Sequence, residues 1–156
     1  MTVYMDDYDV DTRPLIGLLL RLLGQHWGND VDGALRAAGF DGIRPAHANV
    51  FPFVPPEGVH VSELAQRARV RKQTMAQAVE QLERMGYVER RPDPNDRRAK
   101  LVFLTERGQG VGPVGVAAGQ RVEQRWAELT SPEEIEALRR ALLRLVDRLG
   151  KSRPDA

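Results

Sequence analysis

The sequence of 156 residues contains no cysteine. This absence excludes disulfide bonds, thiol-based sensing, thiolate nucleophiles and cysteine metal sites, and it fits a reducing compartment. Aromatic residues are also scarce, at 6% of the chain. Hydrophobic and charged residues, at 42% and 29%, are close to the values of ordinary globular proteins. The chain can therefore bury a core as one domain without covalent cross-links.

Long hydrophobic runs are missing as well. The strongest candidate, residues 15–20, is followed by Arg21 and is too short to span a bilayer. A secretory signal carries positive charge near its start, whereas four acidic residues stand here, Asp6, Asp7, Asp9 and Asp11. We therefore expect a cytoplasmic protein without a membrane partner.

Sequence signatures of enzymes do not occur. There is no Gly-x-Ser-x-Gly elbow, dinucleotide fingerprint or phosphate-binding loop with its lysine. The three histidines, His26, His47 and His60, stand in no metal-ligand spacing with one another or with a carboxylate on one helix face. We therefore expect no enzymatic activity, no metal and no cofactor, and we interpret His60 as a cap of the helix that follows it.

The net charge is only +1, but the charge is unevenly distributed. Residues 67–107 contain 11 Lys or Arg and 6 Asp or Glu, whereas the rest of the chain contains 12 and 16. A basic segment is either a solvated face or a surface for an acidic partner such as nucleic acid. Charge alone does not decide between them.

Helical periodicity is the main pattern that is present. From about Thr12 to Ala38, leucines recur at steps of three and four residues, and the apolar surface extends almost all the way round. Such a helix needs cover on more than one side, which a partner subunit supplies as readily as its own core. A last helix begins with Ser131-Pro132-Glu133-Glu134, an N-cap followed by a capping box, and continues to Leu149.

The apolar stripes of these two helices predict a dimerisation surface, although packing within one chain would use the same residues. A further helix begins at Thr105, but glycines and Pro113 crowd it, so we expect it to be bent or broken near Pro113. The residues that we assign to dimerisation are Leu15, Leu18, Leu19, Leu22, Leu138, Leu142, Leu145 and Leu149.

The middle of the chain combines short helices with a hairpin. Met75, Val79 and Leu82 form the inward stripe of one helix, and Gly86 ends that helix. The expected elements are helices over 45–54, 61–69 and 71–85 and strands over 87–91 and 100–104, joined by the turn-rich residues 92–96. The last two helices and the hairpin constitute a helix-turn-helix followed by a wing. The predicted fold class is mainly α with a small β-hairpin wing (α+β).

The helix over 71–85 exposes polar residues in its first two turns, where a recognition helix meets base edges in the major groove. A glutamine side chain pairs with adenine, and an alanine methyl packs against the methyl of thymine. Cations at the start of a helix oppose its dipole, and they make more sense if phosphates lie nearby. The predicted recognition residues are Arg71, Lys72, Gln73, Thr74, Ala76 and Gln77.

A second basic cluster flanks the expected hairpin tip. Such an arm can reach an adjacent minor groove or the DNA backbone, although a basic turn on its own also serves solubility. Asp96 stands two residues before Arg98, where its carboxylate could aim the guanidinium. The predicted wing and flank residues are Arg90, Arg91, Asp96, Arg97, Arg98 and Lys100.

Three stretches of the sequence resemble one known family. They are residues 61–65, residues 71–75, and residues 79–90 with the wing 93–108, which includes the wing-tip pattern Asp96-Arg97-Arg98 and the closing pattern Leu104-Thr105-Glu106-Arg107-Gly108. On these residues the chain is similar to the MarR (multiple antibiotic resistance regulator) family. Arg71 and Gln77 depart from the small hydroxyl residue and the arginine that are frequent at their positions in that family, so we do not carry over its base preferences.

The resemblance implies that residues 1–156 are a single MarR-like domain. In such a domain residues 43–108 form a winged helix-turn-helix lobe, and residues 12–40 and 109–150 form a helical lobe that makes a homodimer. The resemblance also implies that Arg98 is the wing-tip arginine and that Asp96 orients it. Many relatives are repressors that are released by small aromatic or lipophilic ligands bound between the two lobes.

A planar effector would need aromatic contacts. The candidates for such a pocket are Trp27, Phe51, Phe53 and Trp126, although packing in the core or at the dimer interface explains them more simply.

These observations predict a sequence-specific regulator that binds double-stranded DNA in the nucleoid. We expect a ligand-responsive, homodimeric repressor on an inverted-repeat operator. Two alternatives stay open, namely a winged-helix module for an acidic protein and a ligand or metal sensor in which DNA binding is subordinate. Selection of one duplex sequence over random DNA separates the leading interpretation from the first alternative.

Overall fold

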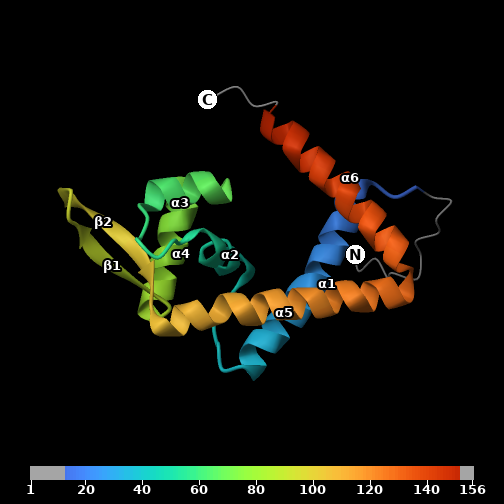
Figure 1. Cartoon of the computed structure of the whole chain (residues 1–156), viewed down its shortest axis with the longest axis horizontal. Coiled ribbons are helices and arrows are strands. Elements are labelled where there is room, and N and C mark those ends of the chain that lie inside the picture. The colour runs from blue at the N-terminus through green and yellow to red at the C-terminus, as the bar shows by residue number, and fades with distance from the viewer. Residues whose placement is uncertain (1–12, 152–156) are drawn as a thin grey trace, which may run out of the picture. The chain divides into compact units, whose positions relative to one another are not determined.

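The computed structural model describes residues 13–151 (Figure 1). The elements in chain order are α1 (Ile16–Ala37), α2 (Pro45–Ala48), the 3₁₀ helix η3 (Phe51–Phe53), α3 (Val61–Ala68), α4 (Lys72–Arg84), β1 (Val88–Asp93), β2 (Asp96–Leu104), α5 (Glu106–Leu129) and α6 (Pro132–Lys151). The two strands pair antiparallel. The predicted class, mainly α with a small hairpin, is therefore confirmed. Thr12, the predicted start of the first helix, lies outside the described residues.

The described chain forms two compact units, residues 13–115 and residues 116–151. The first unit contains α1 to α4, the hairpin and the start of α5, and the second contains the rest of α5 and α6. The two compact units do not test the predicted DNA-binding and dimerisation lobes, because those lobes were defined by function. The predicted lobes stay a prediction.

α4 supplies the centre of the core in the first unit. Met75, Val79 and Leu82, together with Ala78, are buried on one face of this helix. Leu64 of α3 belongs to the same buried cluster. The predicted inward stripe is therefore confirmed. The other members of the cluster are Leu35, Ile43, Val50, Phe51, Val59, Ala65, Tyr87, Val88, Val102 and Val111.

A glycine turns the chain from α4 into the hairpin, as predicted. Gly86 has a φ of +79°, a backbone conformation that side chains other than glycine rarely adopt. Its N–H donates to the Glu83 carbonyl at 3.0 Å, and the Tyr87 N–H donates to the Leu82 carbonyl at 2.9 Å. These two bonds satisfy carbonyls at the end of the helix that otherwise have no partner.

The junction between the hairpin and α5 is packed around Tyr87. The Tyr87 ring is fully buried, and its hydroxyl donates to the Asp41 carbonyl at 2.8 Å. A Cβ atom on Gly108 would lie 1.9 Å from the Tyr87 carbonyl oxygen, so only glycine lets α5 start this close. Thr105 binds three partners here: its hydroxyl donates to the Gly86 carbonyl at 2.6 Å and accepts from the Gly108 N–H at 3.1 Å, and its own N–H donates to the Tyr87 carbonyl at 3.1 Å.

Two helix predictions differ from the structure. The helix expected over residues 45–54 is only the four-residue α2 followed by η3, because Pro52 has no N–H to continue an α-helix. We expected α5 to be bent or broken near Pro113; the break is wrong, since α5 continues through that residue, and the bend stays a prediction. A proline removes one N–H from the helix, and the turns on either side of Pro113 retain the helical conformation.

The hairpin is longer than predicted. β1 extends to Asp93 and β2 begins at Asp96, so the five-residue tip that we expected shrinks to Pro94 and Asn95. The Asp93 carboxylate accepts a hydrogen bond from the Asn95 N–H at 2.8 Å, which stabilises a tight turn. Figure 1 shows this hairpin projecting from the side of α3 and α4.

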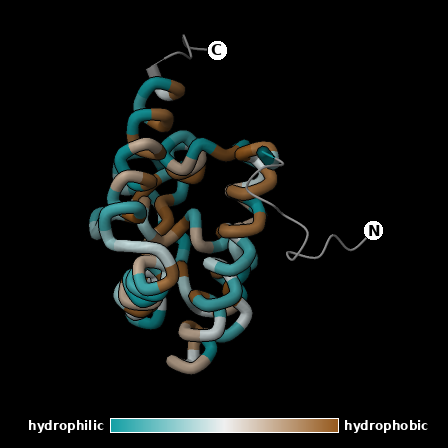
Figure 2. The backbone as a smooth tube through the Cα atoms, turned by 90° about the vertical axis from the view of Figure 1, so that its right-hand side faces the viewer, coloured by the Kyte–Doolittle hydropathy of each residue, from teal (hydrophilic) through white to brown (hydrophobic). Residues whose placement is uncertain are grey.

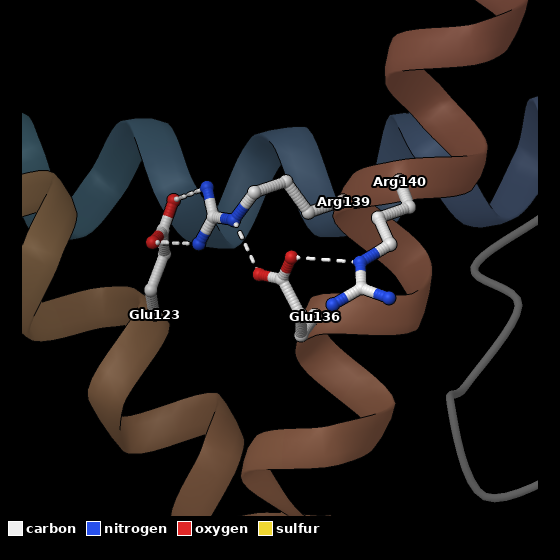
Figure 3. A network of polar contacts seen from close by, with 4 residues as sticks. All are labelled: Glu123, Glu136, Arg139 and Arg140. Carbon is white, nitrogen blue, oxygen red and sulfur yellow. Dashed lines mark hydrogen bonds and ion pairs between the residues drawn. The ribbon is translucent and has the colours of Figure 1, made fainter.

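The second unit consists of two helices joined by an ion-pair network (Figure 3). Arg139 of α6 reaches both carboxylate oxygens of Glu123 on α5, at 3.2 and 2.5 Å, and Glu136 pairs with both Arg139 and Arg140. The hydrogen bond from Arg140 lowers the pKa of Glu136. The predicted N-cap is confirmed, because the Ser131 hydroxyl accepts from the Glu134 N–H at 3.1 Å. Along α6, which leads toward the label C in Figure 2, hydrophobic and hydrophilic stretches alternate.

Candidate nucleic-acid interface

The first two turns of α4 present a polar surface to solvent. Lys72, Gln73, Thr74, Ala76 and Gln77 are all exposed, on the side opposite the buried stripe. No acidic residue stands in the first turn of this helix, and its N-cap position makes no side-chain cap hydrogen bond. The N–H groups at this end can therefore face an anionic partner.

Arg71 occupies the N-cap position of α4, with an extended backbone and an exposed side chain. Two residues earlier, Arg69 has a φ of +55°, in the left-handed region that arginine occupies at a small cost. Arg69 is exposed at the turn of the helix-turn-helix and was not among the predicted recognition residues. Only its position in the turn between the two helices could have identified Arg69 in the sequence, because no residue spacing marks it.

Three cations are exposed on β2 near the hairpin tip, namely Arg97, Arg98 and Lys100. The Asp96 carboxylate accepts a hydrogen bond from the Arg98 backbone N–H at 3.0 Å. Among residues 13–151 no ion pair joins Asp96 to the Arg98 guanidinium, so the contact between these two residues is the one to the backbone N–H, and the orienting role of Asp96 stays a prediction. Asp96 thus shapes the strand that carries Arg98.

The other two predicted cations of the hairpin are engaged by the protein itself. Arg90 binds Glu83 at the end of α4, with Nη2 2.6 Å from Oε2. Arg91 lies with its guanidinium 4.6 Å from the centroid of the Phe103 ring and also pairs with Glu89. The sequence grouped all five cations together, whereas the structure separates these two from the three near the tip.

A contact that the sequence did not reveal joins the start of α3 to the hairpin turn. The His60 Nε2 atom lies 2.9 Å from Asp93 Oδ2, and Asp93 is only 8% exposed. His60 does occupy the N-cap position of α3, but its side chain makes no cap hydrogen bond, so its predicted role as a cap is wrong. The two residues are far apart in sequence, and no local pattern connects them.

His47 is buried and connects α2 to α4. Its Nδ1 accepts from the Arg44 N–H at 3.0 Å, which leaves Nε2 as the N–H donor to Gln81 Oε1 at 2.6 Å. This hydrogen bond ties Gln81, an exposed residue of α4, to α2.

The aromatic residues proposed for an effector pocket fall into different environments. Phe51 is buried and meets Tyr87 edge to face at a centroid distance of 6.1 Å, which confirms the simpler interpretation that it belongs to the core. Phe53 is half-buried and packs against that core. Trp27 and Trp126 are half-buried and already have interaction partners. A ligand pocket stays a prediction.

Two other kinds of feature are absent from residues 13–151. No group of three or more His, Asp or Glu is placed to hold a metal ion in this part of the chain. No helix in the same range combines the length and apolarity needed to cross a membrane.

The geometry agrees with the comparisons to known proteins. A model of the MarR family matches residues 42–99, which span η3 and α2 to α4 and most of the wing. The transcriptional regulator HosA of Escherichia coli O111:H- is 28% identical over 96 residues, which cover 62% of this chain and 71% of HosA. The crystal structure of MarR is 27% identical, with a TM-score of 0.70 over 88% of this chain and 98% of MarR. The chain thus matches the MarR family in sequence over residues 42–99 and is similar in fold to MarR over most of its length.

Another similar structure is that of CouR from Rhodococcus jostii RHA1 bound to p-coumaroyl-CoA. It is 28% identical, with a TM-score of 0.63 over 84% of this chain and 90% of CouR. On these similarities the chain is a DNA-binding transcriptional regulator rather than an enzyme. In a winged helix-turn-helix, the second helix and the hairpin are the elements that meet DNA, and here these are α4 and the β1–β2 wing.

Proposed function

We propose that this regulator is a homodimeric repressor that binds an inverted-repeat operator. Each protomer inserts the first two turns of α4 into the major groove, and the wing tip lies against the adjacent minor groove or backbone. The observation that carries the proposal is a set of exposed cations on these two elements, none of which forms an ion pair with a carboxylate of residues 13–151. They are Arg71, Lys72, Arg97, Arg98 and Lys100.

The distribution of exposed apolar side chains supports the homodimer. Within residues 13–151, all large hydrophobic side chains that are exposed lie outside residues 43–108, on or next to α1, α5 and α6. An apolar surface of this kind is costly in water unless a partner covers it. The exposed residues of this kind include the predicted dimerisation residues Leu15, Leu19, Leu138, Leu145 and Leu149, whereas Leu18, Leu22 and Leu142 are half-buried.

A two-fold symmetric dimer of this design reads two half-sites about 10 base pairs apart. The operator is first selected from a random duplex pool, and its affinity is then measured by fluorescence anisotropy at several salt concentrations. If the dimer contacts about eight phosphates, the log–log slope of affinity against salt is near −7. Absence of affinity for any duplex at low salt contradicts the proposal and favours an acidic protein partner.

Two substitutions distinguish backbone contact from base reading. Arg98→Ala removes a wing cation and weakens binding to most duplexes alike, since phosphates carry no sequence information. Gln77→Ala removes a predicted base contact, worth about 1–3 kcal/mol of discrimination, and changes the preference at particular base pairs. Identical effects of the two substitutions on a panel of operator variants contradict this division of roles.

We also propose that a small aromatic or lipophilic effector releases the repressor from DNA. CouR, a similar protein, binds an aromatic acyl thioester, and half-buried aromatic side chains are present here at Trp27, Phe53 and Trp126. A panel of aromatic acids and their thioesters, titrated against the protein–operator complex, tests this part. A compound that binds the protein should lower its operator affinity, and binding without that effect contradicts the release mechanism.

A further inference from the structure

Glu83 and Arg90 join the end of the recognition helix to the base of the wing. Arg90 donates to Glu83 Oε2 from Nε at 3.0 Å and from Nη2 at 2.6 Å, and its backbone N–H donates to Oε1 at 3.1 Å. The hydrogen bond from the Arg90 side chain lowers the pKa of Glu83, although burial opposes the shift. The carboxylate is therefore ionised near neutral pH and uses both of its oxygens on Arg90.

The register of the hairpin explains why the Arg90 N–H is available to Glu83. Arg90 stands opposite Val102, and the N–H and carbonyl of Val102 are both bonded to Val59, at 2.8 and 3.1 Å. Opposite residues of an antiparallel pair either bond to each other or both turn their polar backbone atoms outward. The Arg90 N–H thus points away from β2. The hairpin is held on both edges at the same level, by Val59 beside β2 and by Glu83 beside β1.

We propose that Glu83 and Arg90 are positioning residues, which fix the wing relative to α4 so that the recognition helix and the wing-tip cations engage DNA together. Neither residue needs to touch DNA, because the free cations Arg97, Arg98 and Lys100 lie further along the wing. This inference rests on the proposed function only in so far as one of its tests measures DNA affinity.

The direction in which one substitution changes DNA affinity distinguishes this positioning role from a purely electrostatic effect. Glu83 is a negative charge on the side of the protein that meets a polyanion, so its removal alone strengthens DNA binding. A positioning role predicts weaker binding instead. Glu80 provides a matched control on the same helix, because it forms its ion pair with Arg84 of α4. Glu80 acts on Arg90 of the wing only through a Coulombic interaction, the weakest of those that raise the pKa of Arg90, and makes no hydrogen bond to it.

The first experiment compares Glu83→Gln with Glu80→Gln on the selected operator by fluorescence anisotropy, with thermal unfolding to confirm that both variants fold. Both changes remove one negative charge from α4 with the same near-isosteric side chain. We expect E83Q to weaken operator binding about five- to tenfold and E80Q to leave it unchanged or strengthen it. Operator binding by E83Q that is as tight as binding by E80Q overturns the proposal.

A second comparison uses the dependence on salt. Arg97→Gln removes a cation that we assign to a phosphate, so its log–log slope becomes shallower by about 0.9 for each phosphate that the protein no longer neutralises. Arg90→Gln should weaken binding without changing the slope. A slope change in R90Q that equals the change in R97Q identifies Arg90 as a DNA contact and overturns its positioning role.

The third readout does not involve DNA. Amide hydrogen exchange of residues 86–104 is measured on the full-length free protein, and we expect faster exchange in E83Q and R90Q than in the wild type or in E80Q. Unchanged exchange in both variants overturns the proposal. If no variant and no wild-type protein binds a duplex while the exchange differences appear, the proposed function fails and the positioning of the wing stands.

Discussion

At the scale of single residues, Gly108 limits how closely α5 approaches the hairpin. A methyl group at this position would meet the Tyr87 carbonyl at 1.9 Å, and backbone cannot move aside as a flexible side chain can. We expect Gly108→Ala to lower the free energy of unfolding by about 3 kcal/mol. Gly112→Ala is the control in the same helix, since nothing lies within 4 Å of its added methyl. That change should raise stability by about 0.5–1 kcal/mol in urea denaturation at a fixed protein concentration.

The pair of His60 and Asp93 leads to a second prediction at this scale. Asp93 is 8% exposed, and His60→Ala would leave one of its carboxylate oxygens without the histidine partner. We expect a loss of about 1–2 kcal/mol in the free energy of unfolding. His26→Ala, which changes an exposed histidine on α1, should have almost no effect in the same denaturation experiment. Equal effects of the two substitutions would show that the buried carboxylate does not depend on His60.

At the scale of elements, the contact between α4 and the wing depends on pH. The pKa of Glu83 lies below its ordinary value of 4.5 in the folded protein, chiefly because Arg90 binds the carboxylate. Its contribution to stability is therefore present above that ordinary value and is lost as the pH falls through the folded pKa. The side chains of the pair are about a third exposed, which limits the contribution to about 1 kcal/mol or less.

Denaturation of wild type and E83Q at a series of pH values tests this dependence. The difference between their free energies of unfolding should be constant above about pH 6 and should shrink below about pH 4.5. A difference that persists unchanged into strong acid would show that the charge of Glu83 does not stabilise the contact.

The elements with local signals were predicted from the sequence. The buried stripe of Met75, Val79 and Leu82, the glycine after α4 and the Ser131 cap each depend on residues within a few positions of one another. The break expected at Pro113 was wrong for the same reason. That expectation considered only the N–H that proline lacks and not the packing of the whole helix.

The pairing of the wing cations could not be predicted in this way. Which arginine is free depends on contacts made across the fold, such as Glu83 with Arg90 or the Phe103 ring with Arg91. The sequence therefore identified the basic surface but not the division of its members into free and engaged cations. His60 and Asp93 were missed because their contact joins residues that are far apart in the sequence.

At the scale of the whole molecule, the oligomeric state is the main prediction. Leu145 is 54% exposed on the stripe that we assign to the dimer interface, and Leu143, outside that stripe, is 61% exposed. Leu145→Asp should shift the protein toward monomer in sedimentation velocity and should lower its operator affinity, because a buried charge in an interface is costly. Leu143→Asp is the matched control and should remain dimeric. A dimer that survives L145D but not L143D would move the interface to the other face of α6.

The three hydrogen bonds of Thr105 have a mechanical consequence. One side chain and its amide fasten the exit of α4, the foot of the wing and the first turn of α5 to a common point. We therefore expect a displacement of the first turn of α5 to shift the end of α4 and the base of the wing together.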